Sequence, residues 1–355
     1  MSLTVVSVAY PLAPVGPDAV GGAEQVLSRI DMALVRAGHR SIVIACEGSR
    51  TAGTLAAVPL PGGTLDEAAR TRAQERTRSV IAATLQSWPV DLVHLHGVDF
   101  DAYLPPAGVP VLVTLHLPRA FYRPAALTPS RPETWMHCVS QAQHADFPAS
   151  DTLLGWIENG VPFGNLAARH AKRRFALVMG RICPEKGVHL AIEAARQADI
   201  ALLIAGEVFP YEAHRRYFEE EVRPRLDHRR RFIGPIDFVR KRRLLAAAQC
   251  LLVPSLVQET SSLVAREAAA CGTPVVAFPS GALSDTVEHG RTGFLVEDVN
   301  GMAQAIGEAP RLDPGLCRQI ARERFSEARM IERYFALYER LARKRSGPAE
   351  MDGAA

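Results

Sequence analysis

Residues 180–187 (GRICPEKG) have the types and spacing that could do chemistry on an anion. They follow an apolar run that predicts a strand, and Arg181 and Lys186 bracket the turn into a helix. Two cations near a helix N-terminus are unfavourable unless an anion lies between them. A forked guanidinium and a point ammonium charge suit the oxygens of a diphosphate. Alternatively, Glu185 and solvent balance the two charges.

Residues 254–267 (PSLVQETSSLVARE) repeat this order of strand, turn and helix. Glu259 precedes the helix, and Glu267 lies eight positions later. Free backbone N–H groups of residues 261–263, at the start of the helix, could share with Glu259 the binding of a phosphate and a polyhydroxylated ring. Glu267 would then accept hydrogen bonds from ribose hydroxyls. In the alternative, Glu259 caps the helix and Glu267 pairs with Arg266 or solvent.

Residues 21–24 (GGAE) open the first predicted helix after a flexible loop. Gly21 and Gly22 let a backbone approach a ligand closely, and the helix N-terminus favours an anion. In the alternative, the glycines form an ordinary turn and Glu24 stabilises the first helical turn. The spacing is not G-x-G-x-x-G, so it does not indicate nicotinamide binding.

Three histidines on predicted strands are candidates for chemistry. His94 and His96 share one face of a strand, but a zinc site needs further ligands that the sequence does not offer nearby, so we expect no metal. His116 ends an apolar strand, and ligands of open α/β sheets lie beyond the carboxyl ends of the strands. His116 is therefore either a contact to a sugar or leaving group, or a structural histidine.

Short apolar runs alternate with helical periodicity along the chain, without strict polar alternation inside the runs. This pattern is typical of parallel strands covered on both faces. Strands are predicted at 3–9, 41–45, 91–96, 111–116, 137–140, 175–179, 201–205, 231–233, 250–253, 274–277 and 293–296. Helices are predicted at 23–37, 66–87, 184–197, 211–225, 237–248, 262–271, 300–308 and 326–344.

The predicted fold class is α/β, with two Rossmann-like doubly wound domains that face each other across a cleft. We expect the first domain at residues 1–165 and the second at 166–325. Residues 326–345 predict a terminal helix, and residues 346–355 a loose tail.

Composition places the chain among ordinary globular proteins. Of its 355 residues 48% are hydrophobic and 22% charged, which excludes a disordered chain, a fibre and a small disulfide scaffold. A net charge of +3 does not favour nucleic acid as a partner. Six scattered cysteines, the lack of a long apolar run and a start without a basic region predict a cytoplasmic protein.

Taken in order, these segments resemble the motifs of retaining glycosyltransferases of family 4. Residues 272–277 (GTPVVA) and 288–296 (EHGRTGFLV) strengthen the resemblance, which extends over residues 3–340. It implies the GT-B fold and transfer of a hexose, with retention, from a nucleotide diphosphate sugar to an undetermined acceptor. A UDP-sugar is favoured and a GDP-sugar stays open. No cofactor and no metal are implied.

The resemblance also implies roles for single residues. Catalytic roles fall on His116, Arg181, Lys186 and Glu259. Donor-binding roles fall on Gly21, Gly22, Gly180, Gly206, Glu207, Ile233, Gly234, Ser261, Ser262, Leu263 and Glu267. The first domain would bind the acceptor, which could be a saccharide, a lipid or a small metabolite. The second domain would bind the donor, and the terminal helix would cross back to the first.

The sequence departs from the family where Thr260-Ser261-Ser262 replaces the common Gly-Phe-Gly, which points to an unusual donor preference. Two other functions of similar fold stay open, a nucleotide-sugar 2-epimerase and a non-catalytic sugar-nucleotide-binding protein. Arginines at 70, 72, 76 and 78, at 229–231 and within 240–243 either dock the protein peripherally on the inner membrane face or form solvated surfaces.

Overall fold

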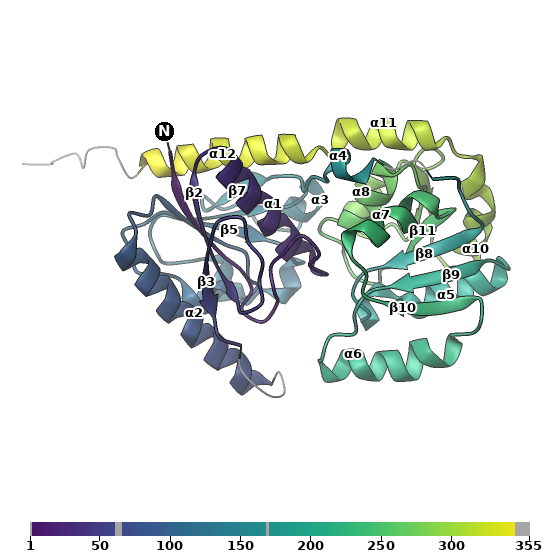
Figure 1. The fold of residues 1–355 in the computed structure, drawn as a ribbon, viewed down its shortest axis with the longest axis horizontal. Coiled ribbons are helices and arrows are strands. Elements are labelled where there is room, and N and C mark those ends of the chain that lie inside the picture. Colours follow the sequence, from purple (N-terminus) through teal and green to yellow (C-terminus); the bar gives the residue numbers. More distant parts are fainter. Residues whose placement is uncertain (1, 61–65, 168–169, 345–355) are drawn as a thin grey trace, which may run out of the picture.

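The computed structural model describes residues 2–60, 66–167 and 170–344. The chain forms two lobes, each a parallel sheet with helices on both faces (Figure 1). The first sheet has seven strands in the order β3-β2-β1-β4-β5-β6-β7, and the second has six in the order β10-β9-β8-β11-β12-β13. This arrangement confirms the predicted α/β fold class with two doubly wound sheets.

The strands of the first sheet are β1 Thr4–Val8, β2 Arg40–Cys46, β3 Thr54–Val58, β4 Leu92–Leu95, β5 Val111–Leu115, β6 Thr134–Cys138 and β7 Leu153–Trp156. Those of the second are β8 Phe175–Met179, β9 Ala201–Ala205, β10 Arg230–Gly234, β11 Cys250–Val253, β12 Val275–Ala277 and β13 Gly293–Leu295. The central strands β1, β4, β5 and β11 are buried along their whole length, as expected of parallel strands between helix layers.

The helices of the first lobe are α1 Gly22–Arg36, α2 Glu67–Ser87 and α3 Gln141–Ala145, with α4 Phe163–Leu166 at the joint. Those of the second are α5 Val188–Gln197, α6 Glu212–Tyr217, α7 Phe238–Ala247, α8 Leu263–Ala270, α9 Ala282–Thr286, α10 Val299–Glu308 and α11 Pro314–Arg324. The last helix, α12 Glu327–Lys344, runs along the first lobe (Figure 1, yellow).

The structure differs from the predicted elements at several places. The strands β3 and β7 were not predicted, although their segments TLAAV and LLGW are apolar. Both are short, mostly half-buried strands at a sheet edge, and their Ala and Gly residues have a low strand propensity. The helix predicted at 184–197 is broken at Gly187 (φ 59°), which separates a 3₁₀ turn from α5. The strand predicted at 137–140 begins earlier, as β6. The helices α9 and α11 were also missed.

The chain crosses between the lobes twice, and the two crossings lie side by side. The Val161 N–H donates to the Phe325 carbonyl over 2.9 Å, just before α12 begins. From there α12 packs on the first sheet, where Tyr334 and Tyr338 are fully buried. The predicted tail at 346–355 lies outside the described residues.

A chain of buried polar groups fastens α12 to the first sheet. His94 contacts the Tyr338 hydroxyl through Nδ1 and the Thr114 hydroxyl through Nε2, each over 2.7 Å. The Thr114 hydroxyl also lies 2.7 Å from His137 Nε2, and His137 Nδ1 donates to the Cys138 carbonyl over 3.0 Å. Since that carbonyl can only accept, His137 Nδ1 carries a proton. With both rings neutral, the Thr114 hydroxyl donates to His137 Nε2 and accepts from His94 Nε2, and the Tyr338 hydroxyl donates to His94 Nδ1.

Burial is the main reason why these imidazoles stay neutral. It lowers the pKa of His137 to about 4 and that of His94 well below the ordinary value. His96 and His116 behave in the same way, the pKa of His116 falling to about 3. An unfolded chain would instead protonate all four near their ordinary pKa of about 6.5.

Acid should therefore destabilise the fold. The folded pKa values lie below the unfolded one, so the stability is complete above about pH 6.5 and is lost as pH falls toward 4. Each such histidine contributes about 1.4 kcal/mol per pH unit in that window. We expect urea unfolding at about pH 7.5 and about pH 5 to give this slope, and His137→Gln to flatten it.

The exposed His228 offers a matched control, because His228→Gln should leave the slope of stability against pH unchanged. A slope for His137→Gln equal to that of the unmodified protein would show that the buried histidines do not govern the acid response.

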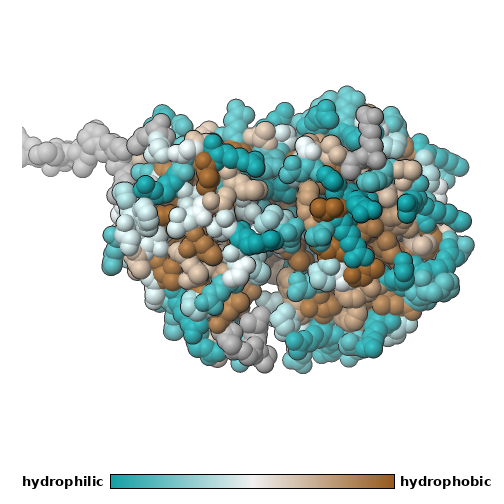
Figure 2. Space-filling model, in the orientation of Figure 1, coloured by the Kyte–Doolittle hydropathy of each residue, from teal (hydrophilic) through white to brown (hydrophobic). Residues whose placement is uncertain are grey.

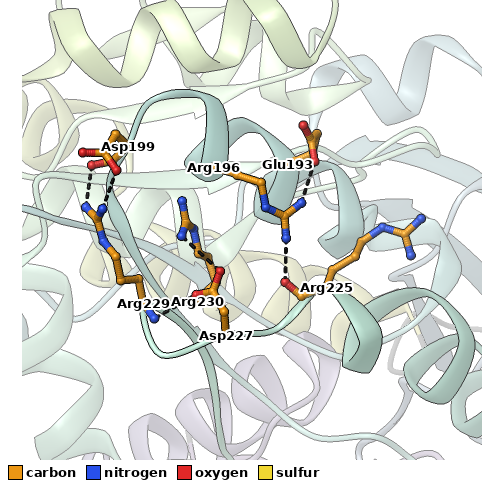
Figure 3. A network of polar contacts seen from close by, with 7 residues as sticks. All are labelled: Glu193, Arg196, Asp199, Arg225, Asp227, Arg229 and Arg230. Carbon is orange, nitrogen blue, oxygen red and sulfur yellow. Dashed lines mark hydrogen bonds and ion pairs between the residues drawn. The ribbon is translucent and has the colours of Figure 1, made fainter.

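The arginines that suggested a lipid surface are largely engaged within the protein. Figure 3 shows Arg229 paired with Asp199, and Arg230 paired with Asp227 over 3.1 Å. On α2, Arg70 pairs with Glu67 over 2.7 Å. Within the described ranges, no helix combines the length and the apolar character needed to cross a bilayer. Peripheral membrane contact stays a prediction.

Candidate donor site between the lobes

The candidate site lies at the carboxyl ends of the strands of the second sheet. Figure 2 shows a hollow between the lobes that opens at the lower edge of the view. At the end of β9, an ideal Cβ on Gly206 would lie 1.8 Å from the Gly180 carbonyl oxygen. The backbones of β8 and β9 can approach this closely only because residue 206 is glycine. The Gly206 N–H also donates to the Gly234 carbonyl over 3.0 Å, so three predicted glycines lie in one row.

Lys186 and Glu259 meet at the centre of this site. Lys186 Nζ lies 2.5 Å from Glu259 Oε1, and the Ser255 hydroxyl donates to the same oxygen. Burial alone would raise the pKa of the Glu259 carboxyl, but Lys186, Ser255 and Arg181 outweigh it and hold that pKa below its ordinary value. Glu259 is therefore an anion with a 9% exposed side chain, and its contacts place Lys186 at the donor turn.

Arg181 is close enough to influence several titratable groups but forms no ion pair with any described residue. Its charge opposes the rise that burial causes in the pKa of Glu24, Glu185 and Glu259. The pKa of Glu24 stays raised, whereas hydrogen bonds and nearby cations bring the pKa values of Glu185 and Glu259 below their ordinary value. The guanidinium is half-buried. A half-buried cation without a carboxylate contact is suited to bind a ligand anion.

Glu24, which was not predicted as a site residue, faces this cation from the first lobe. It is buried, and burial raises the pKa of its carboxyl. An ideal Cβ on Gly21 would lie 1.8 Å from Glu24 Oε2, so Gly21 makes room for this carboxyl rather than for a ligand. Gly22 is exposed, and an ideal Cβ there would meet Leu263 of the other lobe at 3.4 Å.

The turn before α8 carries the predicted residues Ser261, Ser262 and Leu263. The Ser261 hydroxyl is buried and has no hydrogen-bond partner among the described residues. Ser262 is the N-cap of α8, and no side chain caps this helix end. The first N–H groups of α8 therefore stay available for an acceptor atom of a ligand.

Glu267 lies on α8 as predicted, but its partner is one that neither interpretation anticipated. Its Oε1 atom lies 2.7 Å from Lys241 Nζ on α7 and 3.8 Å from Arg29 on α1 of the other lobe. Arg266, the partner considered from the sequence, instead donates to Glu158 and to the Asn159 carbonyl. The Glu267 side chain is only 3% exposed. Because Arg29 belongs to the first lobe and Glu267 to the second, their contact joins the lobes.

His116 lies at the end of β5 and approaches the donor turn from the first lobe. Its Nε2 atom lies 3.0 Å from His96 Nδ1, and its carbonyl accepts a 2.7 Å hydrogen bond from the Thr260 hydroxyl. His96 Nε2 is buried without a partner. Burying an acceptor nitrogen without a partner costs less than burying an N–H without one, so His96 Nε2 carries no proton. The proton of His96 is then on Nδ1 and is donated to His116 Nε2, which leaves the proton of His116 on its Nδ1.

The predicted donor-binding residues at the carboxyl ends of β9 and β10 are Gly206, Glu207, Ile233 and Gly234. The Ile182 N–H donates to the Glu207 carbonyl over 2.9 Å, which joins the loop after β9 to the Arg181 turn. Ile233 is half-buried beside Gly234. Sequence reasoning missed an aromatic residue here. The hydroxyl of Tyr211 interacts with Tyr10 of the first lobe and, after burial, contributes most to raising the pKa of Tyr10.

Two clusters of the described residues resemble metal sites. The sequence predicts no Asp-x-Asp motif of the metal-dependent transferase kind, but Asp99 and Asp101 do form an Asp-x-Asp triplet. Asp99 accepts from Tyr103 over 2.9 Å and from Gln74 over 2.7 Å, and Asp101 pairs with Arg123 over 2.6 Å. These carboxylates are thus engaged by the protein itself.

The second cluster consists of Cys183, Glu185 and His214, whose ligand atoms lie within 4.8 Å of one another. Burial raises the pKa of the Cys183 thiol to about 11. This thiol donates a 3.9 Å hydrogen bond to the Arg181 carbonyl. Glu185 Oε2 and His214 Nδ1 are buried without a hydrogen-bond partner among the described residues.

Comparison with known proteins decides the family. A model of Glycosyltransferase Family 4 matches residues 20–147, and a model of Glycosyl transferases group 1 matches residues 173–309. The two matches cover the two lobes in turn. The chain belongs to the GT-B glycosyltransferases.

Solved structures agree with this assignment of the chain to the glycosyltransferases. AviGT4, a glycosyltransferase involved in avilamycin A biosynthesis, is 25% identical and superposes with a TM-score of 0.70, covering 96% of this chain and 98% of AviGT4. Anabaena Alr3699/HepE in complex with UDP and glucose shares the fold at 18% identity, with a TM-score of 0.74 and coverages of 95% and 100%.

Curated relatives match only part of the glycosyltransferase. Glycogen synthase of Mycobacterium tuberculosis is 34% identical over 177 residues, which is 47% of this chain and 42% of that enzyme. D-inositol 3-phosphate glycosyltransferase of Kribbella flavida is 37% identical over 181 residues, or 45% and 41% of the two chains. The chain thus spans less than half the length of the curated relatives it matches.

The Lys241–Glu267 pair gives a stability test of the glycosyltransferase. Lys241→Met would leave the buried Glu267 carboxylate without its nearest cation, and we expect a loss of about 3 kcal/mol in the free energy of urea unfolding. Adding Glu267→Gln should recover part of this loss, because the stranded charge is removed.

Arg343→Met serves as the matched control, since Arg343 and Glu339 form an exposed pair whose loss should cost less than about 1 kcal/mol. Equal effects of Lys241→Met and Arg343→Met would contradict the structural role of the buried pair.

Proposed function

We propose that the protein transfers a hexose, with retention of the anomeric configuration and without a metal ion, from a nucleoside diphosphate sugar to an acceptor. The observation that carries the proposal is the position of Arg181. This cation has no ion pair with a described residue, and it lies beside the Lys186–Glu259 pair. A donor diphosphate would supply the anion that Arg181 lacks.

Charge balance supports transfer without a metal. As the bond from the anomeric carbon to the diphosphate breaks, negative charge grows on the leaving oxygen, and Arg181, Lys186 and the N-terminus of α8 stabilise it. The Lys186 ammonium group would then contact the diphosphate and bind Glu259 less closely. The freed Glu259 oxygen accepts a hydrogen bond from a hydroxyl of the transferred sugar.

The protonation state of His116 decides where the acceptor's proton goes. Because burial lowers the pKa of His116 to about 3, the ring is a weak base and acts at neutral pH as a hydrogen-bond donor through Nδ1. The acceptor oxygen forms its bond to the anomeric carbon on the face that the diphosphate leaves. Its proton passes to the departing phosphate oxygen, and this geometry gives retention.

The choice of donor rests on the loops at Gly206 and Gly234 and on the similar structures. A complex of Alr3699/HepE with UDP and glucose favours a UDP-sugar as the first donor to test here. A GDP-sugar stays the second choice, and the acceptor is undetermined. In this proposal Glu267 keeps its role toward the ribose through Oε2, since Lys241 and Arg29 contact Oε1.

Activity should depend on Lys186. With a panel of nucleotide sugars and saccharide acceptors, we expect acceptor-dependent release of free nucleoside diphosphate that persists in EDTA, and a product whose anomeric configuration by proton NMR equals that of the donor. Lys186→Ala should lose about 2–3 kcal/mol of transition-state stabilisation, roughly 30- to 150-fold in turnover.

Arg311→Ala is the control, because Arg311 is exposed and distant from the donor turn. Near-native turnover of Lys186→Ala would contradict the proposed role of the lysine. Conversion of the nucleotide sugar without an acceptor would instead indicate a 2-epimerase, and nucleotide binding without any turnover would indicate a non-catalytic binding protein.

A further inference from the structure

Three consecutive carbonyls at the end of β5 are held by side chains, and the middle one is held from the other lobe. The Gln143 side-chain amide donates to the Leu115 and Leu117 carbonyls, each over 2.9 Å. Between them, the His116 carbonyl accepts from the Thr260 hydroxyl over 2.7 Å. Gln143 belongs to the same lobe as His116, whereas Thr260 belongs to the donor lobe.

Thr260 stands on a turn that is itself fixed to the donor lobe. The carbonyl of Glu259, the preceding residue, accepts from the Ala282 N–H over 2.7 Å. The carboxylate of Glu259 is held by Lys186 and Ser255. A hydroxyl on such a turn has little freedom, so its hydrogen bond transmits the position of the donor lobe to His116.

We propose that Thr260 is a positioning residue, which sets His116 over the donor turn when the two lobes close. The proposal rests on the proposed function, since it gives His116 a role toward the transferred sugar. The ring of His116 is held by His96, over 3.0 Å, and its backbone by Thr260. The ring is thus held from within the first lobe and the backbone carbonyl from the donor lobe.

Other contacts between the lobes cannot replace this one. The Phe238 N–H donates to Asp18 Oδ1 over 3.0 Å, and Tyr10 interacts with Tyr211. Neither contact touches His116 or the turn that carries Glu259. A glycine at position 260, as the family commonly has, would offer no hydroxyl, so this coupling is a property of the present chain.

The kinetic test compares two substitutions of Thr260. Thr260→Val keeps the shape of the side chain and removes the hydroxyl, so kcat should fall about five- to ten-fold, the effect of one hydrogen bond, while KM for the donor changes less than about two-fold. Thr260→Ser keeps the hydroxyl and should restore kcat. Thr286→Val is the matched control, because the Thr286 hydroxyl donates to Ala282 within α9.

A second readout needs no turnover. Spin labels on Ser79→Cys and Glu212→Cys, both exposed and one in each lobe, report the distance between the lobes in the ligand-free protein. We expect Thr260→Val to shift the population toward longer distances, and Thr260→Ser and Thr286→Val to leave it unchanged.

The outcomes separate the two hypotheses. Unchanged kcat and unchanged distances for Thr260→Val would overturn the role of Thr260, even if the protein transfers sugar. A lowered melting temperature with unchanged kcat would overturn it too, since the hydroxyl would then be only structural. Absence of transfer and of nucleotide binding in the unmodified protein would refute the proposed function. The spin-label distances would still test whether the hydrogen bond from Thr260 to His116 holds the lobes together.

Discussion

Arg181 is a half-buried cation that no described carboxylate contacts directly, although three carboxyl groups lie near enough for it to lower their pKa values. The arrangement around it follows from this imbalance. Glu259 is committed to Lys186 and Ser255. The protein therefore has, among its described residues, an unpaired positive charge at the carboxyl ends of its parallel strands, which is where this fold binds ligands.

The first lobe contributes a neutral imidazole at the donor turn. Burial lowers the pKa of His116 to about 3, so this ring is uncharged at physiological pH. A neutral histidine can orient a sugar without competing with Arg181 for the diphosphate.

Much of the fold followed from local pattern, because fully buried parallel strands such as β1 and β5 are continuous apolar runs. The edge strands β3 and β7 were missed because their short apolar segments are rich in Ala or Gly, which have a low strand propensity. The site shows a similar limit. The turn at residues 180–187 could be predicted as a site because two cations lie beside glycines. Glu24 could not, because its sequence position is that of an ordinary glutamate in the first turn of a helix.

Contacts between distant parts of the chain were beyond sequence reasoning. Glu267 was weighed against its neighbour Arg266, but Lys241 is brought to it by the packing of α7 on α8. The hydrogen bond from Thr260 to His116 joins residues 144 positions apart and exists only because the lobes meet. The first pair depends on how two helices of one lobe pack, and the second on how the two lobes are placed, and no local pattern encodes either.

The central claim is that Arg181 binds the diphosphate of the donor. Calorimetric titration of the purified protein with UDP, GDP and ADP in EDTA tests it. The account predicts that one nucleotide binds without metal, and that Arg181→Ala weakens its binding roughly 10- to 100-fold, the cost of lost charge-assisted hydrogen bonds. Arg311→Ala should bind as the unmodified protein does. Failure of all three nucleotides to bind, or equal binding by Arg181→Ala, would contradict the account.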